Sequence, residues 1–169
     1  IKAMCFCKNY INLIIKMKLY KIIFIFLAIN FGALAIGSWL MDNGPMTDWY
    51  INLNQAPWSP PGWVFGAAWT TIMICFSIYM AYLFKFFKDS KLLVLFGIQF
   101  VLNVIWNYIF FNQHLIGIGL IVIVILTIIV GTFLTSYHNK LKIKSLLIVP
   151  YLLWLLIATS LNAYIYLYN

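Results

Sequence analysis

Apolar runs separated by short polar segments fill most of this chain. Five of the runs are long enough to cross a bilayer, which takes about 20 predominantly apolar residues. They cover residues 19–41, 61–84, 92–111, 115–137 and 146–167. Because hydrocarbon offers no water to backbone N–H and C=O groups, runs of this kind fold as helices. The pattern predicts an all-α membrane protein, built as a bundle of five transmembrane helices.

Lysines divide the loops into two classes. Residues 16–21, 85–91 and 140–144 hold three lysines each, and the loops between these clusters hold none. Lysine-rich loops stay on the cytoplasmic side of a membrane. The alternation predicts a cytoplasmic N-terminus, and it places the C-terminus and the loop between the first two runs outside.

Composition leads to the same class of protein. The chain is 65% hydrophobic and 8% charged, with a mean hydropathy of +0.99. A soluble domain of this length cannot bury so much apolar surface, so lipid must be the solvent. A net charge of +8 would suggest nucleic acid in a soluble protein. Here the lysines flank apolar runs, and we expect a lipid bilayer and no nucleic acid as partner.

The five runs leave no room for a second domain, so residues 17–169 are interpreted as a single five-helix domain. Residues 1–16 are interpreted as an N-terminal extension that need not be native, because residues 17–21 resemble a true start. From Met17 the chain also resembles a signal peptide that ends at Ala33-Leu34-Ala35. The apolar run continues through Leu40, which favours an uncleaved first helix.

Tryptophan and proline are concentrated in the loop after the first run and at the start of the second run. Residues 49–69 hold four of the seven tryptophans and three of the five prolines. Pro57, Pro60 and Pro61 remove backbone donors and predict a stiff, non-helical loop. Indole rings in such a loop suit either a membrane–water interface or the lid over a flat apolar ligand.

Three of the predicted helices carry polar or aromatic faces. The third helix carries Gln99, Asn103 and Asn107 at spacings of four residues, and Trp106 borders this face. The fifth helix carries Tyr151, Trp154, Ala158 and Asn162 on one face. The second helix carries Phe65, Trp69, Met73 and Phe76 at helical spacing. An amide without a hydrogen-bond partner is costly in free energy in hydrocarbon, so the helix face that carries the amides must point into the bundle. Such faces serve either as interhelical packing and hydrogen bonding or as the walls of a pocket.

Catalytic constellations are missing, and no catalytic or metal-binding residue is predicted. The acids Asp42, Asp48 and Asp89 all fall in predicted loops. His114 and His138 are expected on opposite sides of the membrane. Cys5, Cys7 and Cys75 lack the spacing of metal ligands. Nucleophile, phosphate-loop and zinc-protease motifs are absent from the sequence.

Several motifs resemble the TspO/translocator protein family, also known as tryptophan-rich sensory proteins and peripheral benzodiazepine receptors. They are W-Y-x-x-L from Trp49, P-W-S-P-P-x-W-V-F-G from Pro57, L-N-x-x-W from Leu102 and P-Y-L-x-W-L from Pro150. The resemblance implies a five-helix bundle, usually a homodimer, with a pocket under the loop between the first two helices. It implies ligand-binding roles for Tyr50, Pro60, Trp69, Asn103, Trp106, Trp154 and Ala158. The ligand-binding roles of Tyr50 and Pro60 are implied by the resemblance alone.

Two of the departures from this family pattern bear on dimerisation and on sterol binding. Val94 and Ile98 stand where some members have a G-x-x-x-G dimerisation motif, and the first helix offers residues 28–32 and 33–37 as small-residue substitutes. The final helix lacks a basic residue after its tyrosines, so a sterol role has no local support.

The resemblance implies an integral membrane receptor of the bacterial inner membrane. Its ligands would be porphyrins such as protoporphyrin IX and haem, with no obligatory cofactor and a link to tetrapyrrole regulation or stress. Two alternatives stay open: a light-dependent porphyrin-degrading enzyme, and a small transporter of tetrapyrroles or sterols. The absence of an intramembrane acid and of an internal repeat disfavours transport.

Overall fold

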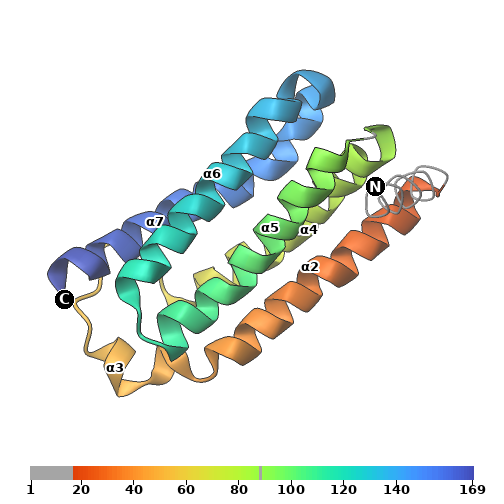
Figure 1. The fold of residues 1–169 in the computed structure, drawn as a ribbon. Coiled ribbons are helices and arrows are strands. Elements are labelled where there is room, and N and C mark those ends of the chain that lie inside the picture. The colour runs from red at the N-terminus through yellow and green to blue at the C-terminus, as the bar shows by residue number, and fades with distance from the viewer. Residues whose placement is uncertain (1–16, 88) are drawn as a thin grey trace, which may run out of the picture.

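The structure, a computed structural model, describes residues 17–87 and 89–169, and within these residues it is helical without any β-strand. The long helices of the described residues are α2 (Leu19–Met41), α4 (Gly62–Phe86), α5 (Ser90–Asn107), α6 (Ile116–Leu141) and α7 (Val149–Tyr168) (Figure 1). Short helical segments join them: η1 (Gly44–Met46), α3 (Asp48–Ile51), the π-helical turn η2 (Tyr108–Asn112) and η3 (Lys142–Ile148). The all-α prediction is confirmed. The expectations about residues 1–16 lie outside the described residues.

Length and hydropathy mark four candidate membrane spans among the described residues. Three coincide with α2, with α4, and with α5 continued through η2, and the fourth is the whole stretch Ile116–Tyr168. Within that stretch α6 and α7 lie side by side as a hairpin that reverses at η3 (Figure 1). The reversal begins at Lys142, whose φ of 52° is uncommon for a residue with a side chain.

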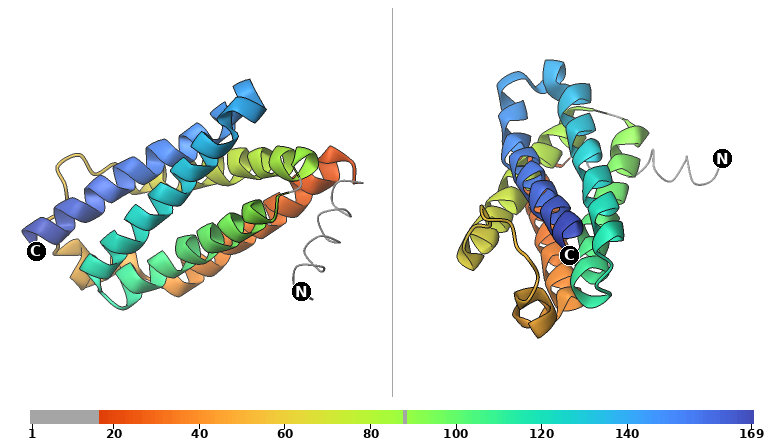
Figure 2. Two further views of the ribbon diagram at one scale, coloured as in Figure 1. Left: turned by 45° about the horizontal axis from the view of Figure 1, so that its top comes forward. Right: turned by 90° about the vertical axis from the view of Figure 1, so that its left-hand side faces the viewer.

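The long helices form a closed ring in which each packs against two neighbours. Helix α2 packs on α4 and α5, α5 packs on α6, α6 packs on α7, and α7 returns to α4 (Figure 2). The described lysines all lie at the end formed by the start of α2, the α4–α5 connection and η3, which we call the lysine end. The opposite end carries residues 42–61 and the end of α7, and we call it the loop end (Figure 1).

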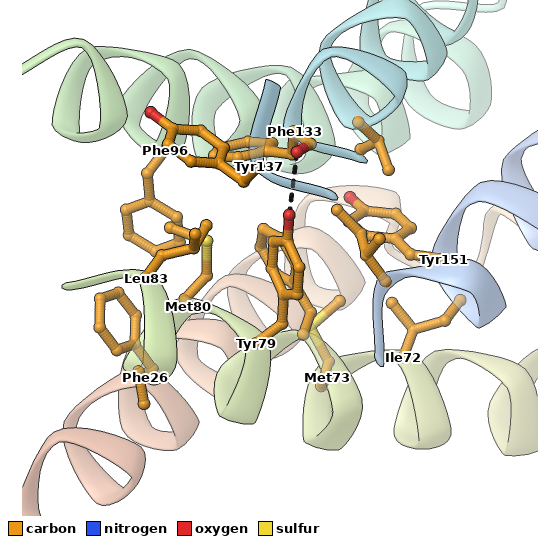
Figure 3. Packing of buried hydrophobic residues seen from close by; sticks show 14 of the residues in the cluster. Phe26, Ile72, Met73, Tyr79, Met80, Leu83, Phe96, Phe133, Tyr137 and Tyr151 are labelled. Atoms are coloured by element: carbon orange, nitrogen blue, oxygen red, sulfur yellow. Dashed lines mark hydrogen bonds between the residues drawn. The ribbon is translucent and has the colours of Figure 1, made fainter. Parts of the chain in front are cut away.

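Aromatic and sulfur-containing side chains fill the core near the lysine end. Phe76, Tyr79, Met80, Phe133 and Tyr151 are at most 1% exposed. Figure 3 shows the last four of these side chains packed together. The Tyr79 hydroxyl donates a hydrogen bond to the Phe133 carbonyl oxygen at 2.9 Å, so this phenol is buried with its polar atom satisfied. Because large aromatic rings bury much area and interlock edge to face, this cluster fixes the positions of α4, α6 and α7.

Helix α4 is covered along only part of its length. Its buried residues all fall between Ile72 and Phe84, and none falls in residues 62–71. A Cβ atom built on Gly62 or Gly66 would meet no other atom within 4 Å. The half of α4 at the loop end is therefore not enclosed by its neighbours within the described chain.

Helix α2 is held to both of its neighbours by polar or small residues. The Asn30 side chain donates to the Ser77 hydroxyl of α4 at 2.8 Å, and both residues are buried. On the side of α5, a Cβ atom on Gly37 would lie 2.8 Å from Asn107 Nδ2. Ala33 and Gly37 are buried, so packing within the chain already uses this pair of small residues. Of the two substitutes for the dimerisation motif, only residues 28–32 remain uncovered.

The loop between α2 and α4 is more regular than its prolines predict. Residues 52–61 are non-helical, as expected. Trp49 and Tyr50, however, lie in the short helix α3, whose first turn is capped by Thr47 Oγ1 accepting from the Tyr50 N–H at 3.4 Å. The prediction of a non-helical loop is wrong for these residues, because a threonine cap followed by Asp48 starts a helical turn despite the nearby prolines.

The contact between η1 and η2 gives a test of this packing. A Cβ atom on Gly44 would lie 2.5 Å from Phe111 Cβ, so we expect Gly44→Ala to destabilise the protein by about 1–3 kcal/mol through overpacking. Gly62→Ala is the control, since its methyl group would enter open space. Thermal unfolding in detergent measures both, and equal melting temperatures would contradict the packing.

Candidate functional site

The loop lies across the loop end of the ring, from α5 to α7. At one side, α3 stacks the Trp49 ring on His114 with centroids 3.9 Å apart. At the other side, the Asn54 N–H donates to Asn169 Oδ1 at 2.9 Å, and Trp58 Nε1 donates to the Ser160 hydroxyl at 3.2 Å. The loop therefore lies where a lid would cover a pocket between the helices.

An aromatic cluster lies under α3. Its members are Trp49, Tyr50, Trp106, Phe110 and Phe111, which come from α3, α5 and η2. The Trp106 ring stacks on Phe110 at 5.2 Å, and Tyr50 lies 5.2 Å from Phe111 between centroids. Burial raises the pKa of Tyr50, so its phenol stays a neutral hydrogen-bond donor at physiological pH. The π-helical turn η2 brings the two adjacent phenylalanines to the same cluster.

Below this cluster, a buried hydroxyl joins two of the predicted amides. Gln99 Nε2 donates to the Tyr151 hydroxyl at 2.8 Å, and that hydroxyl donates to Asn103 Oδ1 at 3.3 Å. Gln99, Asn103 and Tyr151 are all buried. The amide face of α5 therefore looks into the bundle as predicted, and we call this chain of bonds the amide junction. It serves the structural role of linking α5 to α7, which are not adjacent in the ring.

Trp69 and Trp154 line the side of the ring formed by α4 and α7. Trp69 is half-buried and meets the Tyr151 ring edge-on at 6.1 Å. Trp154 is buried and meets the half-buried Phe65 ring edge-on at 5.2 Å. These aromatic contacts lie beside the uncovered half of α4.

The predicted ligand-binding residues thus fall into two groups and two isolated positions. Tyr50 and Trp106 belong to the aromatic cluster, and Trp69, Asn103 and Trp154 are grouped around Tyr151 and Phe65. Ala158 packs half-buried against the core, and Pro60 lies half-buried in the loop before α4.

Three polar atoms near these groups are buried without a hydrogen-bond partner among the described residues: Gln99 Oε1, Trp106 Nε1 and Asn162 Oδ1. A buried polar atom without a partner costs about 1–3 kcal/mol. They lie on α5 and α7, in or next to the predicted faces. Polar atoms left in this state are candidates for contact with a bound molecule.

Two open hollows in the surface lie away from this region. One of about 320 Å³ is at the lysine end, and one of about 330 Å³ is an apolar groove along α5 that reaches Leu40 of α2. Neither is lined by a predicted ligand-binding residue.

The predicted set of ligand-binding residues left out four side chains that contact its members. They are Phe65, Phe110, Phe111 and Tyr151, each in ring contact with a predicted residue. Phe65 and Tyr151 were on the predicted faces, so their helical spacing to Trp69 and Trp154 was an available signal. Only the structure shows that the Tyr151 hydroxyl holds both amides.

Within residues 17–87 and 89–169 no cluster of three or more His, Cys, Asp or Glu residues could hold a metal ion. His114 precedes α6 and His138 lies in its last turn, which separates them by roughly 36 Å at 1.5 Å per residue. Asp89 is used structurally, because its carboxylate accepts from the Lys91 N–H and from the Tyr137 hydroxyl, both at 2.9 Å.

Comparison with known proteins adds to this geometry. The sequence profile of the TspO/MBR family matches residues 24–167. A tryptophan-rich protein TspO of Archaeoglobus fulgidus is 36% identical over 156 residues, which are 90% of this chain and 97% of the relative. Protein CrtK of Rhodobacter capsulatus is 32% identical over 118 residues, covering 68% and 74% of the two chains. The translocator protein of Homo sapiens is 30% identical over 122 residues, covering 68% and 70%.

The amide junction gives a second test. Tyr151→Phe keeps the ring and removes the hydroxyl, which leaves the buried amides of Gln99 and Asn103 without their shared partner. We expect a loss of about 1–3 kcal/mol in the free energy of unfolding. Tyr166→Phe, on the same helix with its side chain 55% exposed, should change little. Equal stability of the two variants in detergent would show that the junction contributes nothing.

Proposed function

Because this chain belongs to the TspO/MBR family, we propose that it is a membrane receptor that binds porphyrins such as protoporphyrin IX or haem. The chain is an integral membrane protein, as its apolar spans and its family require. The proposed pocket lies under the loop, between the aromatic cluster and the side of the ring formed by α4 and α7. Its residues are Tyr50, Pro60, Trp69, Asn103, Trp106, Trp154 and Ala158.

The observation that carries the proposal is the uncovered half of α4. Residues 62–71 contribute Phe65 and Trp69 to ring contacts with α7, yet none of these ten residues is buried. A large flat apolar ligand would cover these rings and bury area that the chain leaves open, which is the usual character of small-molecule sites. The unpaired polar atoms supply the few directional contacts that such a ligand also needs.

Ligand entry in this proposal requires the loop to move. The attachment of the loop to α7 is made by exposed hydrogen bonds at Asn54, Trp58 and Asn169, and by one edge-on ring contact between Trp58 and Tyr164. Segments held mainly by exposed hydrogen bonds and few buried contacts open at a low free-energy cost. In the same proposal α6 and α7 are separate spans, giving five, with the lysine end cytoplasmic and the protein a homodimer.

Binding without chemistry is the form of function that we propose. The acids Asp42 and Asp48 lie at the loop end and Asp89 at the lysine end, outside the long apolar helices. General acid–base catalysis within the pocket would need an ionisable pair there. The rings instead offer stacking surface, and the junction amides offer hydrogen bonds.

Binding measurements on single variants test the pocket. Removing an aromatic wall costs about 1–3 kcal/mol, so Trp69→Ala and Trp154→Ala should each weaken protoporphyrin IX binding about tenfold or more. Trp39→Ala is the matched control, because Trp39 is 78% exposed on α2. Absorbance titration of the purified variants measures the affinity. If all three folded variants bind alike, the pocket lies elsewhere.

Thiol labelling tests the orientation, in a background where Cys5, Cys7 and Cys75 are replaced by alanine. A cysteine at Asn52, exposed at the loop end, should react in intact cells with a membrane-impermeant maleimide. A cysteine at Ser90, exposed at the start of α5, should react only after the cells are opened. The reverse pattern would invert the topology.

A further inference from the structure

The cavity of about 320 Å³ at the lysine end lies between the end of α4 and the α6–η3 connection. It is lined by Phe86, Phe87, Lys140, Leu141 and Lys144. We propose that this cavity is a lipid site, which binds the phosphate of an anionic phospholipid between the ammonium groups of Lys140 and Lys144. The site is distinct from the porphyrin pocket, which lies at the opposite end of the bundle.

Aromatic rings hold both ammonium groups at the cavity. Lys144 Nζ lies 4.2 Å from the centroid of the Tyr82 ring and 5.5 Å from that of Phe86. Lys140 Nζ lies 5.2 Å from the Phe87 centroid and 5.7 Å from that of Tyr137. A cation over an aromatic face is attracted to it, so these long side chains are positioned before any anion arrives.

The chain reversal brings the two lysines to one cavity. Lys140 lies in the last turn of α6, Lys144 lies in η3, and Lys142 between them has a φ of 52°. That conformation ends the helix and turns the backbone, with Lys142 itself exposed and outside the lining. The pairing of Lys140 and Lys144 therefore depends on a backbone conformation that residues with side chains adopt infrequently.

The charges around the cavity favour an anion. Among the described residues at this end, Asp89 is the acid, and its carboxylate is held by the Tyr137 hydroxyl and the Lys91 N–H. Lys18, Lys21, Lys85 and Lys91 add positive charge at the same end. Basic pockets between membrane helices on the lysine-rich side of a protein bind anionic headgroups.

The remaining lining favours a lipid over a soluble phosphate. Phe86, Phe87 and Leu141 form the apolar part of the wall, and Phe86 is 58% exposed. Next to the cavity, Ile143 and Leu146 are 74% and 59% exposed. An acyl chain would cover these apolar surfaces while the headgroup meets the ammonium groups, whereas inorganic phosphate would leave them in water.

Native mass spectrometry of the delipidated full chain in a neutral detergent tests the proposal. With dioleoyl phosphatidylglycerol as probe, we expect a single retained lipid per chain, bound about tenfold more tightly than dioleoyl phosphatidylcholine. The double variant Lys140→Gln/Lys144→Gln should weaken phosphatidylglycerol binding about ten- to thirtyfold and leave phosphatidylcholine binding unchanged. The variant Tyr82→Leu keeps every charge and should weaken phosphatidylglycerol binding about threefold, because Lys144 loses a ring that positions its ammonium group.

The matched control is Lys91→Gln/Lys142→Gln, which removes the same charge at the same end from residues outside the lining. This control variant should bind phosphatidylglycerol with the same affinity as the unmodified chain. Equal weakening by both double variants would show a diffuse charge effect and overturn the site. A wild-type protein without preference for phosphatidylglycerol would also overturn it. Displacement of the lipid by inorganic phosphate at comparable concentration would assign the cavity to a soluble anion instead.

Discussion

The hydroxyl group of Tyr151 is buried inside the helical bundle, between two amide side chains of α5. It receives a hydrogen bond from Gln99 and gives one to Asn103, and in doing so it ties α7 to α5 across the interior of the ring. Neighbouring helices are held by packing, but these two helices are not neighbours. Since buried amides without partners are costly in a membrane, the relative rotation and height of α5 and α7 follow from this one group.

The packing of the bundle differs on the two sides of the amide junction. Toward the lysine end, aromatic rings interlock, and all the buried residues of α4 fall between Ile72 and Phe84. Toward the loop end, the same helix loses its cover, and unpaired polar atoms remain on α5 and α7. The densely packed half at the lysine end can hold the helices in place. The half at the loop end can then rearrange around a ligand while the fold persists.

The apolar runs predicted the helices well, because a stretch of about 20 apolar residues has few other structures available in lipid. The inward amide face of α5 was predictable for a related reason, since Gln99 and Asn103 share a helical face and cannot point to lipid. Helix α3 was missed, because four residues are too few to show a period and the nearby prolines argued against a helix.

Partners across the bundle were beyond the reach of the sequence. Helical spacing assigns a residue to a face, but it does not show which atom on another helix that face meets. Gly37 was read as a dimerisation residue and instead faces Asn107 of the same chain. Trp69 and Trp154 were both expected to bind the ligand, and the sequence did not show that each of them meets a different ring partner.

The incomplete cover of α4 also determines the medium from which a ligand arrives. Residues 62–71 belong to an apolar helix long enough to span the bilayer, so their open side faces acyl chains. In the proposed function, a hydrophobic pigment would dissolve in those chains and diffuse to the protein within two dimensions before the loop moves to admit it. The mole fraction of pigment in the membrane would then set the occupancy of the site, and a molecule that fails to partition into lipid would be rejected before any side chain meets it.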